Sequence, residues 1–237
     1  MTVPIIAATG LHTYYGDSHI LHGVDVTIHR GEVVSLMGRN GMGKTTILRS
    51  LMGLTPPRRG TVQINGADMT GAATHVIARL GVAYVPEDRG IFPNLSVREH
   101  LVMAARRGPD GACDWALDDV LALFPRLTER LGNMGNQLSG GEQQMLTIGR
   151  ALMTNPDLII LDEATEGLAP LIRAEVWNVV RRIKDLGVAA LIVDKDINAL
   201  LDIADRHLIL VKGEIVYRGD SNDLRANPER HERYLGV

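Results

Sequence analysis

Residues 38–45 read Gly-Arg-Asn-Gly-Met-Gly-Lys-Thr and match the pattern G-x-x-x-x-G-K-[ST]. An apolar run at 33–37 precedes the motif and a helical pattern at 44–52 follows it, as this motif requires. Glycines let the backbone wrap with its N–H groups inward, and the helix N-terminus adds positive potential for phosphate. A chance match in a glycine-rich turn is the alternative, which the flanking elements disfavour. The motif predicts a nucleotide site formed by Gly38, Arg39, Asn40, Gly41, Met42, Gly43, Lys44, Thr45 and Thr46.

Two side chains of this motif, and two more at the end of a later apolar run, have chemistry suited to phosphoryl transfer. We expect Lys44 to reach the β- and γ-phosphates and the Thr45 hydroxyl to ligate Mg²⁺. The apolar run at 158–161 ends in Asp162 and Glu163, at a strand tip where open α/β sheets bind ligands. Asp162 is expected to hold Mg²⁺ through water, and Glu163 to polarise the attacking water. Solvated loop carboxylates are the alternative, and the phosphate-binding motif outweighs it.

A third motif, Leu-Ser-Gly-Gly-Glu, occupies residues 138–142. A Ser-Gly-Gly turn at the start of a helix offers a hydroxyl, free N–H groups and a dipole, all of which suit an anion. Ser139 followed by Glu142 also fits a plain capping box. The two interpretations are compatible, because the same N–H groups can serve both.

The elements that position these motifs follow from apolar runs at 33–37, 82–85, 158–161 and 190–193. None of these runs alternates with polar residues, which is typical of strands buried on both faces of a mostly parallel sheet. Helical patterns lie between them, at 44–52 and 171–186. The segment up to Arg30, together with 61–66 and its Asn-Gly turn, indicates antiparallel strands. Residues 88–150 contain no convincing strand, and a capping box starts a helix near Val97.

Composition argues against a nucleic-acid-binding, a membrane-spanning, a secreted or a disulfide-linked protein. The 25 Lys and Arg against 28 Asp and Glu give a net charge of −3, so nothing attracts nucleic acid or an anionic membrane surface. No apolar run reaches the roughly 18 residues of a membrane span, and Met1–Pro4 lacks the pattern of a secretory signal. One cysteine, Cys113, excludes an internal disulfide. These features indicate one globular unit of a reducing compartment.

Together, the three motifs in this order and spacing resemble the ATP-binding-cassette (ABC) ATPases over essentially the whole chain. The resemblance implies an α/β P-loop NTPase cassette with a mostly parallel core sheet, an antiparallel β portion and an inserted helical subdomain. Residues 1–237 would form one domain, with 1–87 and 151–237 as the α/β core and 88–150 as the helical subdomain. It also implies ATP and Mg²⁺ as cofactors. Two cassettes would pack head to tail, so that Ser139, Gly140, Gly141 and Glu142 cover ATP held by the partner chain.

The same resemblance assigns two further residues of the pocket. Tyr15 stands where the family places an aromatic ring on adenine; Tyr14 is the competing candidate, and an ordinary strand aromatic the alternative. Glu87 follows Val-Pro where most cassettes have Gln, and it would bind Mg²⁺ and orient water through its carboxylate. Residues 166–170, Glu-Gly-Leu-Ala-Pro, match the loop that crosses the dimer interface.

Lys195 stands where cassettes place a histidine that contacts the γ-phosphate. Lysine neutralises phosphate charge but accepts no hydrogen bond from water. We therefore expect Lys195 to contact phosphate and Glu163 to remain the only water-polarising group. Pairing of Lys195 with the adjacent Asp194 or Asp196 is the alternative.

Glu87 and the 166–170 run are similar to the branched-chain amino acid importer ATPases of the LivF type. The resemblance predicts an ATP-hydrolysing subunit that powers a membrane importer, docked on integral membrane subunits near residues 87–93 at the cytoplasmic face of the inner membrane. A second cassette, a copy or a paralogue, would complete the pair; neither nucleic acid nor direct membrane insertion is expected. The alternatives are a urea importer or lipopolysaccharide exporter ATPase, and a soluble or degenerate cassette not coupled to transport.

Overall fold

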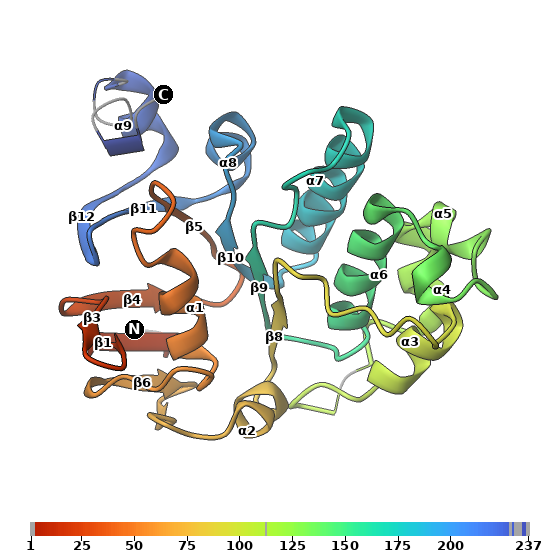
Figure 1. Cartoon of the computed structure of the whole chain (residues 1–237), viewed down its shortest axis with the longest axis horizontal. Coiled ribbons are helices and arrows are strands. Elements are labelled where there is room, and N and C mark those ends of the chain that lie inside the picture. Colours follow the sequence, from red (N-terminus) through yellow and green to blue (C-terminus); the bar gives the residue numbers. More distant parts are fainter. Residues whose placement is uncertain (1–2, 112, 228, 230–233, 236–237) are drawn as a thin grey trace.

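The computed structural model of the chain describes residues 3–111, 113–227, 229 and 234–235 (Figure 1). Its strands are β1 (Ile6–His12), β2 (Tyr14–Tyr15), β3 (Ser18–His19), β4 (Val24–Ile28), β5 (Val33–Met37), β6 (Arg59–Ile64), β7 (Ala67–Asp68), β8 (Val82–Val85), β9 (Leu158–Asp162), β10 (Ala189–Val193), β11 (Arg206–Val211) and β12 (Glu214–Gly219). Its helices are α1 (Lys44–Leu51), α2 (Thr74–Arg79), α3 (Val97–Ala104), α4 (Leu117–Leu123), α5 (Pro125–Thr128), the 3₁₀ turn η1 (Gly135–Gln137), α6 (Gly140–Leu152), α7 (Pro170–Asp185), α8 (Ile197–Ile203) and α9 (Ser221–Ala226).

A six-stranded sheet in the order β12-β11-β5-β10-β9-β8 forms the centre of the molecule. All its pairings are parallel except that of β11 with β12. The four predicted apolar runs are β5, β8, β9 and β10, so this prediction is confirmed. Successive residues of β9 contribute in turn to two apolar cores, Ile159 to one and Ile160 to the other. Because both faces are covered, the sequence shows no alternation of apolar and polar residues.

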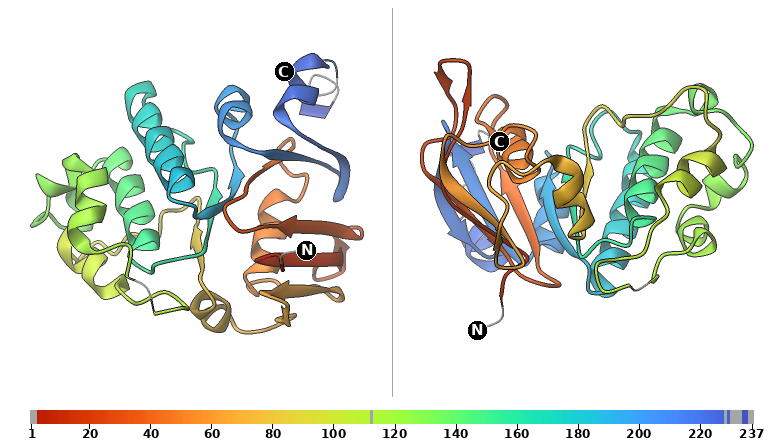
Figure 2. Two further views of the ribbon diagram at one scale, coloured as in Figure 1. Left: turned by 180° about the vertical axis from the view of Figure 1, so that it is seen from behind. Right: turned by 90° about the horizontal axis from the view of Figure 1, so that it is seen from below.

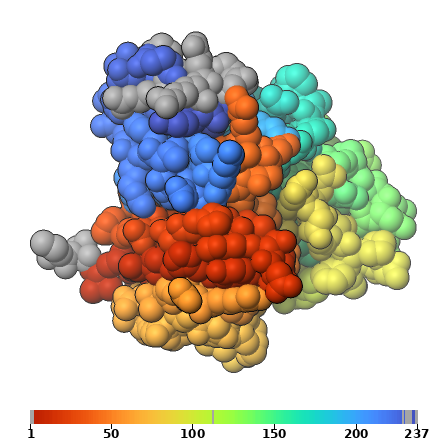
Figure 3. Space-filling model, turned by 60° about the vertical axis from the view of Figure 1, so that its left-hand side comes forward, coloured from red at the N-terminus to blue at the C-terminus, as the bar shows by residue number. Residues whose placement is uncertain are grey.

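The antiparallel portion is a four-stranded sheet in the order β4-β1-β6-β7. Asn65 and Gly66 join β6 to β7 with φ angles of 50° and 81°, the conformation that an Asn-Gly hairpin turn requires. This sheet packs over α1 and one face of the central sheet through a shared apolar core. In Figure 3 the red and orange strands form one surface with the blue β11–β12 segment, although they are far apart in sequence. The predicted antiparallel portion is thus present.

Helices α3 to α6 gather at the opposite end of the molecule from the antiparallel sheet (Figures 1 and 2). Helix α3 begins at Val97 after a capping box made by Ser96 and Glu99, as the sequence predicts. Helix α6 continues to Leu152 and packs on α3 and β8. These helices share one apolar core with β8, β9 and α7, so the helical segment is continuous with the body that carries the sheet.

The C-terminal third holds elements that the apolar runs did not reveal: β11, β12, α8 and α9. His207 lies at the start of β11, just before the apolar run at 208–211, and it is fully buried. Its ring is hydrogen-bonded to Ser35 Oγ at 2.6 Å and to Ser221 Oγ at 2.7 Å, and burial lowers the pKa of His207 to about 4. A neutral, fully bonded histidine is therefore part of the sheet. Among the described residues, no helix combines the length and apolarity that crossing a membrane requires.

Candidate nucleotide-binding site

The carboxyl ends of β5, β9 and β10 meet at one edge of the central sheet. Val193 pairs with Asp162, and Ile192 pairs with Ser35, so the loops that follow these strands are neighbours. A cavity of about 380 Å³ opens there. Its lining residues are Tyr15, Ile20, Asn40, Gly41, Gly43, Lys44, Thr45, Thr46, Glu87, Glu163, Glu166 and Lys195. Parallel pairing thus brings the phosphate-binding motif, Glu163 and Lys195 together, and Tyr15 reaches the same cavity from the separate antiparallel pair β2–β3.

The phosphate loop, residues 38–46, depends on glycine for its shape. Gly38, Gly41 and Gly43 have φ angles of 154°, 78° and 106°. A Cβ on Gly38 would lie 2.6 Å from the Leu210 carbonyl oxygen, so no larger residue fits. Gly43 caps α1 in a left-handed conformation with no side-chain cap, which leaves the first N–H groups of α1 facing outward from the helix.

Lys44 folds back into this loop. Its ammonium group donates to the carbonyl oxygens of Gly38, at 2.9 Å, and Arg39, at 3.3 Å, and lies 3.8 Å from Glu163 Oε1. Only 7% of Lys44 is exposed, and this burial lowers the pKa of its ammonium group against the opposing effect of Glu163. The loop thus holds a positive charge at its centre, beside uncapped helix N–H groups.

Asp162 lies at the floor of the site, 1% exposed. Thr45 Oγ1 donates to its Oδ1 at 3.3 Å, and the Tyr84 hydroxyl donates to its Oδ2 at 2.9 Å. Burial raises the pKa of Asp162, although both hydrogen bonds lower it, and burial also raises the pKa of Tyr84. In the described chain no Lys or Arg forms an ion pair with Asp162. Hard oxygens around a buried carboxylate without a cationic partner fit Mg²⁺.

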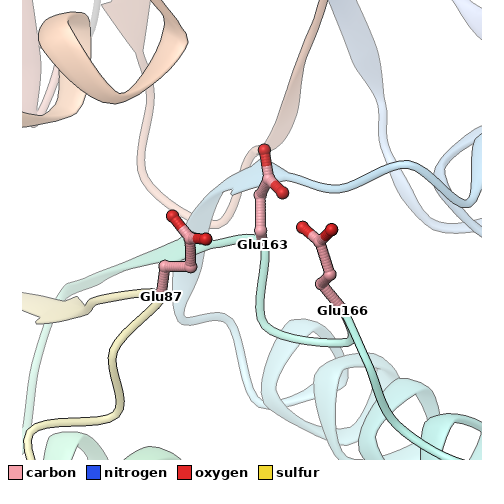
Figure 4. Close-up of side chains that lie close together, drawn as sticks. All are labelled: Glu87, Glu163 and Glu166. Carbon is pink, nitrogen blue, oxygen red and sulfur yellow. The ribbon is translucent and has the colours of Figure 1, made fainter. Parts of the chain in front are cut away.

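Three carboxylates, the acidic cluster of Glu87, Glu163 and Glu166, point into the same space from the loops after β8 and β9 (Figure 4). Their nearest oxygens lie within 4.8 Å of one another. Glu163 has a φ of 50°, uncommon for a residue with a side chain, and its N–H donates to the Val193 carbonyl at 2.8 Å. Burial, together with the hydrogen bond and charge of Glu166, raises the pKa of Glu163 to about 7.

Lys195 faces this cluster. Its ammonium group is ion-paired with Glu166 and lies 3.5 Å from Glu163 Oε2. The alternative that Lys195 pairs with Asp194 or Asp196 is wrong, because both carboxylates are engaged elsewhere. Asp194 accepts from the Thr165 hydroxyl at 2.7 Å, and Asp196 caps α8 through the Ala199 N–H at 3.1 Å.

The two tyrosines of β2 have different surroundings. Tyr15 is 46% exposed and lines the cavity. Tyr14 turns away: its ring stacks on His19 with centroids 4.2 Å apart, and the Arg58 guanidinium lies 4.4 Å from its centroid. Of the two aromatics, Tyr15 is the one placed to meet a ligand in the cavity.

Three residues of the phosphate-binding motif lie outside this cavity. Gly38 and Arg39 line a neighbouring cavity of about 290 Å³, and Arg39 Nε donates to the Leu235 carbonyl at 3.2 Å. The Met42 sulfur accepts from the Lys212 N–H at 3.2 Å. These side chains hold the loop against its surroundings, while the backbone of the loop faces the cavity.

The Leu-Ser-Gly-Gly-Glu segment lies apart from the cavity, at the start of α6. Ser139 Oγ accepts from the Glu142 N–H at 3.3 Å, while Glu142 Oε2 accepts from the Ser139 N–H at 2.7 Å. The predicted capping box is therefore formed. Gly140 faces the Arg89 guanidinium and Gly141 faces Ile172 of α7. Within the described chain the lining of the cavity includes none of residues 139–142.

Two polar residues of the site escaped sequence reasoning. Tyr84 is part of an apolar strand, and only the pairing of β8 with β9 brings its hydroxyl to Asp162. Glu166 belongs to the Glu-Gly-Leu-Ala-Pro run and was expected at an interface rather than in the cavity. The signal available in the sequence was its spacing of three residues from Glu163, which a tight turn brings to one side.

Comparison with known proteins agrees with this geometry. The sequence profile of the ABC transporter family matches residues 21–166. A high-affinity branched-chain amino acid transport ATP-binding protein of Pseudomonas aeruginosa is 40% identical over 224 residues, 94% of this chain and 96% of that protein. The lipopolysaccharide export system ATP-binding protein of Escherichia coli is 30% identical over 233 residues, 98% of this chain and 97% of that protein. A solved ATP-binding subunit of an ABC transporter superposes with a TM-score of 0.83 at 29% identity, over 98% of this chain and 96% of the other. The matched segment contains the phosphate loop, Asp162, Glu163 and residues 138–142, and the chain belongs to the ABC transporter family as an ATP-binding ATPase subunit.

Proposed function

We propose that this chain powers an importer of branched-chain or other amino acids by hydrolysing ATP in the cavity around Lys44. The observation that carries ATP hydrolysis is that Lys44, at the start of α1 after β5, meets Asp162 and Glu163, at the end of β9, at one sheet edge. The choice of transported molecule rests on the 40% identity, over nearly the full length of both chains, to a branched-chain amino acid transport ATP-binding protein.

In this proposal, Lys44 exchanges the carbonyls of Gly38 and Arg39 for phosphate oxygens, because ammonium–phosphate hydrogen bonds are charge-assisted. The N–H groups at residues 41–46 and the start of α1 receive the remaining phosphate charge. Tyr15 stacks on the adenine. Thr45 and Asp162 hold Mg²⁺, with Glu87 as a further oxygen ligand. The bound ion would neutralise charge that develops on the phosphate oxygens.

Glu163 orients and deprotonates the attacking water. Its left-handed backbone conformation, held by the hydrogen bond to Val193, aims the carboxylate into the cavity. A pKa near 7 suits a group that accepts a proton at neutral pH. Lys195 supplies positive charge for the terminal phosphate.

We further propose that a segment of an integral membrane subunit docks in a groove of about 410 Å³ between α2, α3 and α6. Met103 and Leu54 line this groove and are 53% and 42% exposed. The loop after Glu87 is fastened to α6, since Thr147 Oγ1 donates to the Arg89 carbonyl and Arg150 to the Gly90 carbonyl, each at 2.8 Å. A displacement of α6 by the membrane subunit would therefore also move the loop that follows Glu87.

A second cassette, a copy of this chain or a paralogue, completes the proposed assembly. Its ATP would be covered by Ser139, Gly140, Gly141 and Glu142 of this chain, whose distance from their own cavity is consistent with a role in a partner's site. The subunit would lie at the cytoplasmic face of the cell membrane, attached through the membrane subunits.

Purification of the chain from its native membrane tests the assembly. We expect two membrane subunits and a second cassette to accompany it, and reconstituted vesicles to accumulate labelled leucine only with internal ATP. Glu163→Gln should abolish turnover and retain ATP binding.

Lipopolysaccharide extraction without leucine uptake would instead favour the export function suggested by the 30% identical relative. Urea uptake, or ribosomal or DNA-repair proteins in place of membrane subunits, would also overturn the proposal. ATP binding with no turnover in the unmutated complex would indicate a degenerate cassette.

A further inference from the structure

The loops that follow β9 and β10 are joined at two levels. Beneath the surface, the buried Asp194 carboxylate accepts hydrogen bonds from the Thr165 hydroxyl, at 2.7 Å, and the Thr165 N–H, at 3.2 Å. Above them, the Lys195 ammonium group bridges Glu166 and Glu163. The lower contact is buried, whereas the upper one lies in the cavity wall.

The upper contact is open to exchange. The side chains of Lys195 and Glu166 are 50% and 42% exposed, and ion pairs in such surroundings are weak. The ammonium group has three donors on a flexible stem, so it can leave one carboxylate for another acceptor. Lys195 lines the same cavity as Lys44 and Thr45, so a triphosphate bound on the phosphate loop would bring its terminal phosphate toward it.

The charges around this point are unequal. Three carboxylates, Glu87, Glu163 and Glu166, share the space with two ammonium groups, Lys44 and Lys195. A terminal phosphate entering here is repelled by the carboxylates unless a cation is released to meet it. Of the two ammonium groups, Lys195 is the more exposed, with 50% of its side chain accessible against 7% for Lys44, so it has more room to move.

We propose that Glu166 sets the preference of the site for ATP over ADP by competing with the terminal phosphate for Lys195. In the free chain, Glu166 holds Lys195. ATP displaces Glu166 and takes over the ammonium group, while ADP, which lacks the third phosphate, leaves the pair intact. Release of Glu166 frees the 166–170 loop from the cavity wall. This inference rests on the proposed function of the cavity as an ATP site.

The test measures the affinity of the full-length chain for a non-hydrolysable ATP analogue and for ADP, each with Mg²⁺, by titration calorimetry. Glu166→Gln should bind the ATP analogue about 3- to 10-fold more tightly, with ADP affinity changed less than about twofold. Lys195→Met should weaken the ATP analogue by a similar factor and spare ADP. A purely structural role of either residue would not change the ratio of the two affinities.

The double variant separates competition from simple repulsion. If Glu166 acts through Lys195, Glu166→Gln should have little effect on analogue affinity in the Lys195→Met background. An equal gain in both backgrounds would overturn the proposal, because it would reflect repulsion between Glu166 and phosphate alone. Glu175→Gln, which removes a carboxylate from the similarly exposed Arg126 pair outside the cavity, is the matched control and should leave both affinities unchanged.

Failure of this inference can be told from failure of the proposed function. If the unmutated chain binds neither nucleotide, the cavity is not the ATP site. The same conclusion follows if Lys44→Met leaves the affinities for the ATP analogue and for ADP unchanged. If binding depends on Lys44 but the ratio of ATP-analogue to ADP affinity ignores Glu166, the inference alone is wrong.

Discussion

Helices α1 and α6 both begin in a glycine-rich motif, but the first N–H groups of α1 have no side-chain cap, whereas those of α6 do. At α1 the N-cap is Gly43, which offers no side-chain acceptor, and the first turn contains no acidic residue. At α6 the N-cap is Ser139, and a reciprocal capping box with Glu142 satisfies the helix start within its own chain. A helix start without a cap is a ready anion site, whereas a capped one is already stable without a ligand.

Because of this difference, we expect the phosphate loop to bind an anion in its own cavity and residues 139–142 to bind one only when it comes from outside the chain. The phosphate loop folds around Lys44 and places its uncapped N–H groups in a cavity of its own chain. Residues 139–142 lie outside that cavity, so an anion from elsewhere must reach them. The same capping box also occurs at α3, with Ser96 and Glu99, where we assign no ligand. Helix α3 therefore serves as an internal control for α6.

Removing the charge at α1 should have the largest effect. Lys44→Met should weaken ATP binding roughly 100-fold, because charge-assisted hydrogen bonds to two phosphates are lost. Titration calorimetry with the non-hydrolysable analogue measures it. Lys184→Met removes an equal charge from the Asp205 pair outside the cavity and should leave the affinity unchanged. An unaltered affinity for the ATP analogue in Lys44→Met would contradict the claim that the start of α1, unlike that of α6, is the anion site of this chain.

Glycine substitution should distinguish the two motifs by stability. Gly43→Ala should lower the free energy of unfolding by roughly 1–3 kcal/mol. Its φ is 106°, and a Cβ would lie 3.1 Å from Leu21 Cδ2. Gly140→Ala, in α6, carries no positive φ and meets only the flexible end of Arg89, so we expect a change within about 1 kcal/mol of either sign. Urea unfolding compares the two, and equal losses would contradict the expectation.

Serine substitution should separate capping from ligand binding at α6. Ser139→Ala and Ser96→Ala each remove one cap and should each cost about 1 kcal/mol of unfolding free energy. Only Ser139→Ala should also reduce the ATPase rate of the assembled complex, because only α6 would meet a partner's nucleotide. A matching loss of rate in both variants would attribute the effect to stability.

The smallest expected effect is a pH dependence at the two capped helices. The hydrogen bonds from Ser96 lower the pKa of Glu99; at Glu142, burial raises the pKa, but the Ser139 hydrogen bonds and Arg130 outweigh it, so the net shift is downward. A lowered carboxyl pKa contributes stability above the unfolded value of 4.5, and that stability is lost as pH falls. Glu99→Gln and Glu142→Gln should therefore destabilise most at pH 7 and progressively less toward pH 4, as measured by urea unfolding. A loss that is constant with pH would show that the charge is unimportant.

Much of the fold could be predicted because its signals are local. Four of the six strands of the central sheet appear as apolar runs, the Asn-Gly turn defines the β6–β7 hairpin, and the Ser96–Glu99 box starts α3. Strand β11 is not among the predicted strands, although residues 208–211 form an apolar run like the others. Only the tertiary structure shows that His207, beside this run, is buried and hydrogen-bonded to Ser35 and Ser221, 172 and 14 residues away.

The site divides in the same way. The amino-acid sequence alone determined the phosphate loop, the Asp-Glu strand tip and the capping box at Ser139, because each depends on residue types within one short segment. Only the tertiary structure decided that Tyr84 binds Asp162, that Tyr15 rather than Tyr14 faces the cavity, and that Lys195 pairs with Glu166 and Glu163 instead of its neighbours. These contacts join separate strands and loops, and the order of strands in the sheet, which no local pattern specifies, sets which side chains can meet.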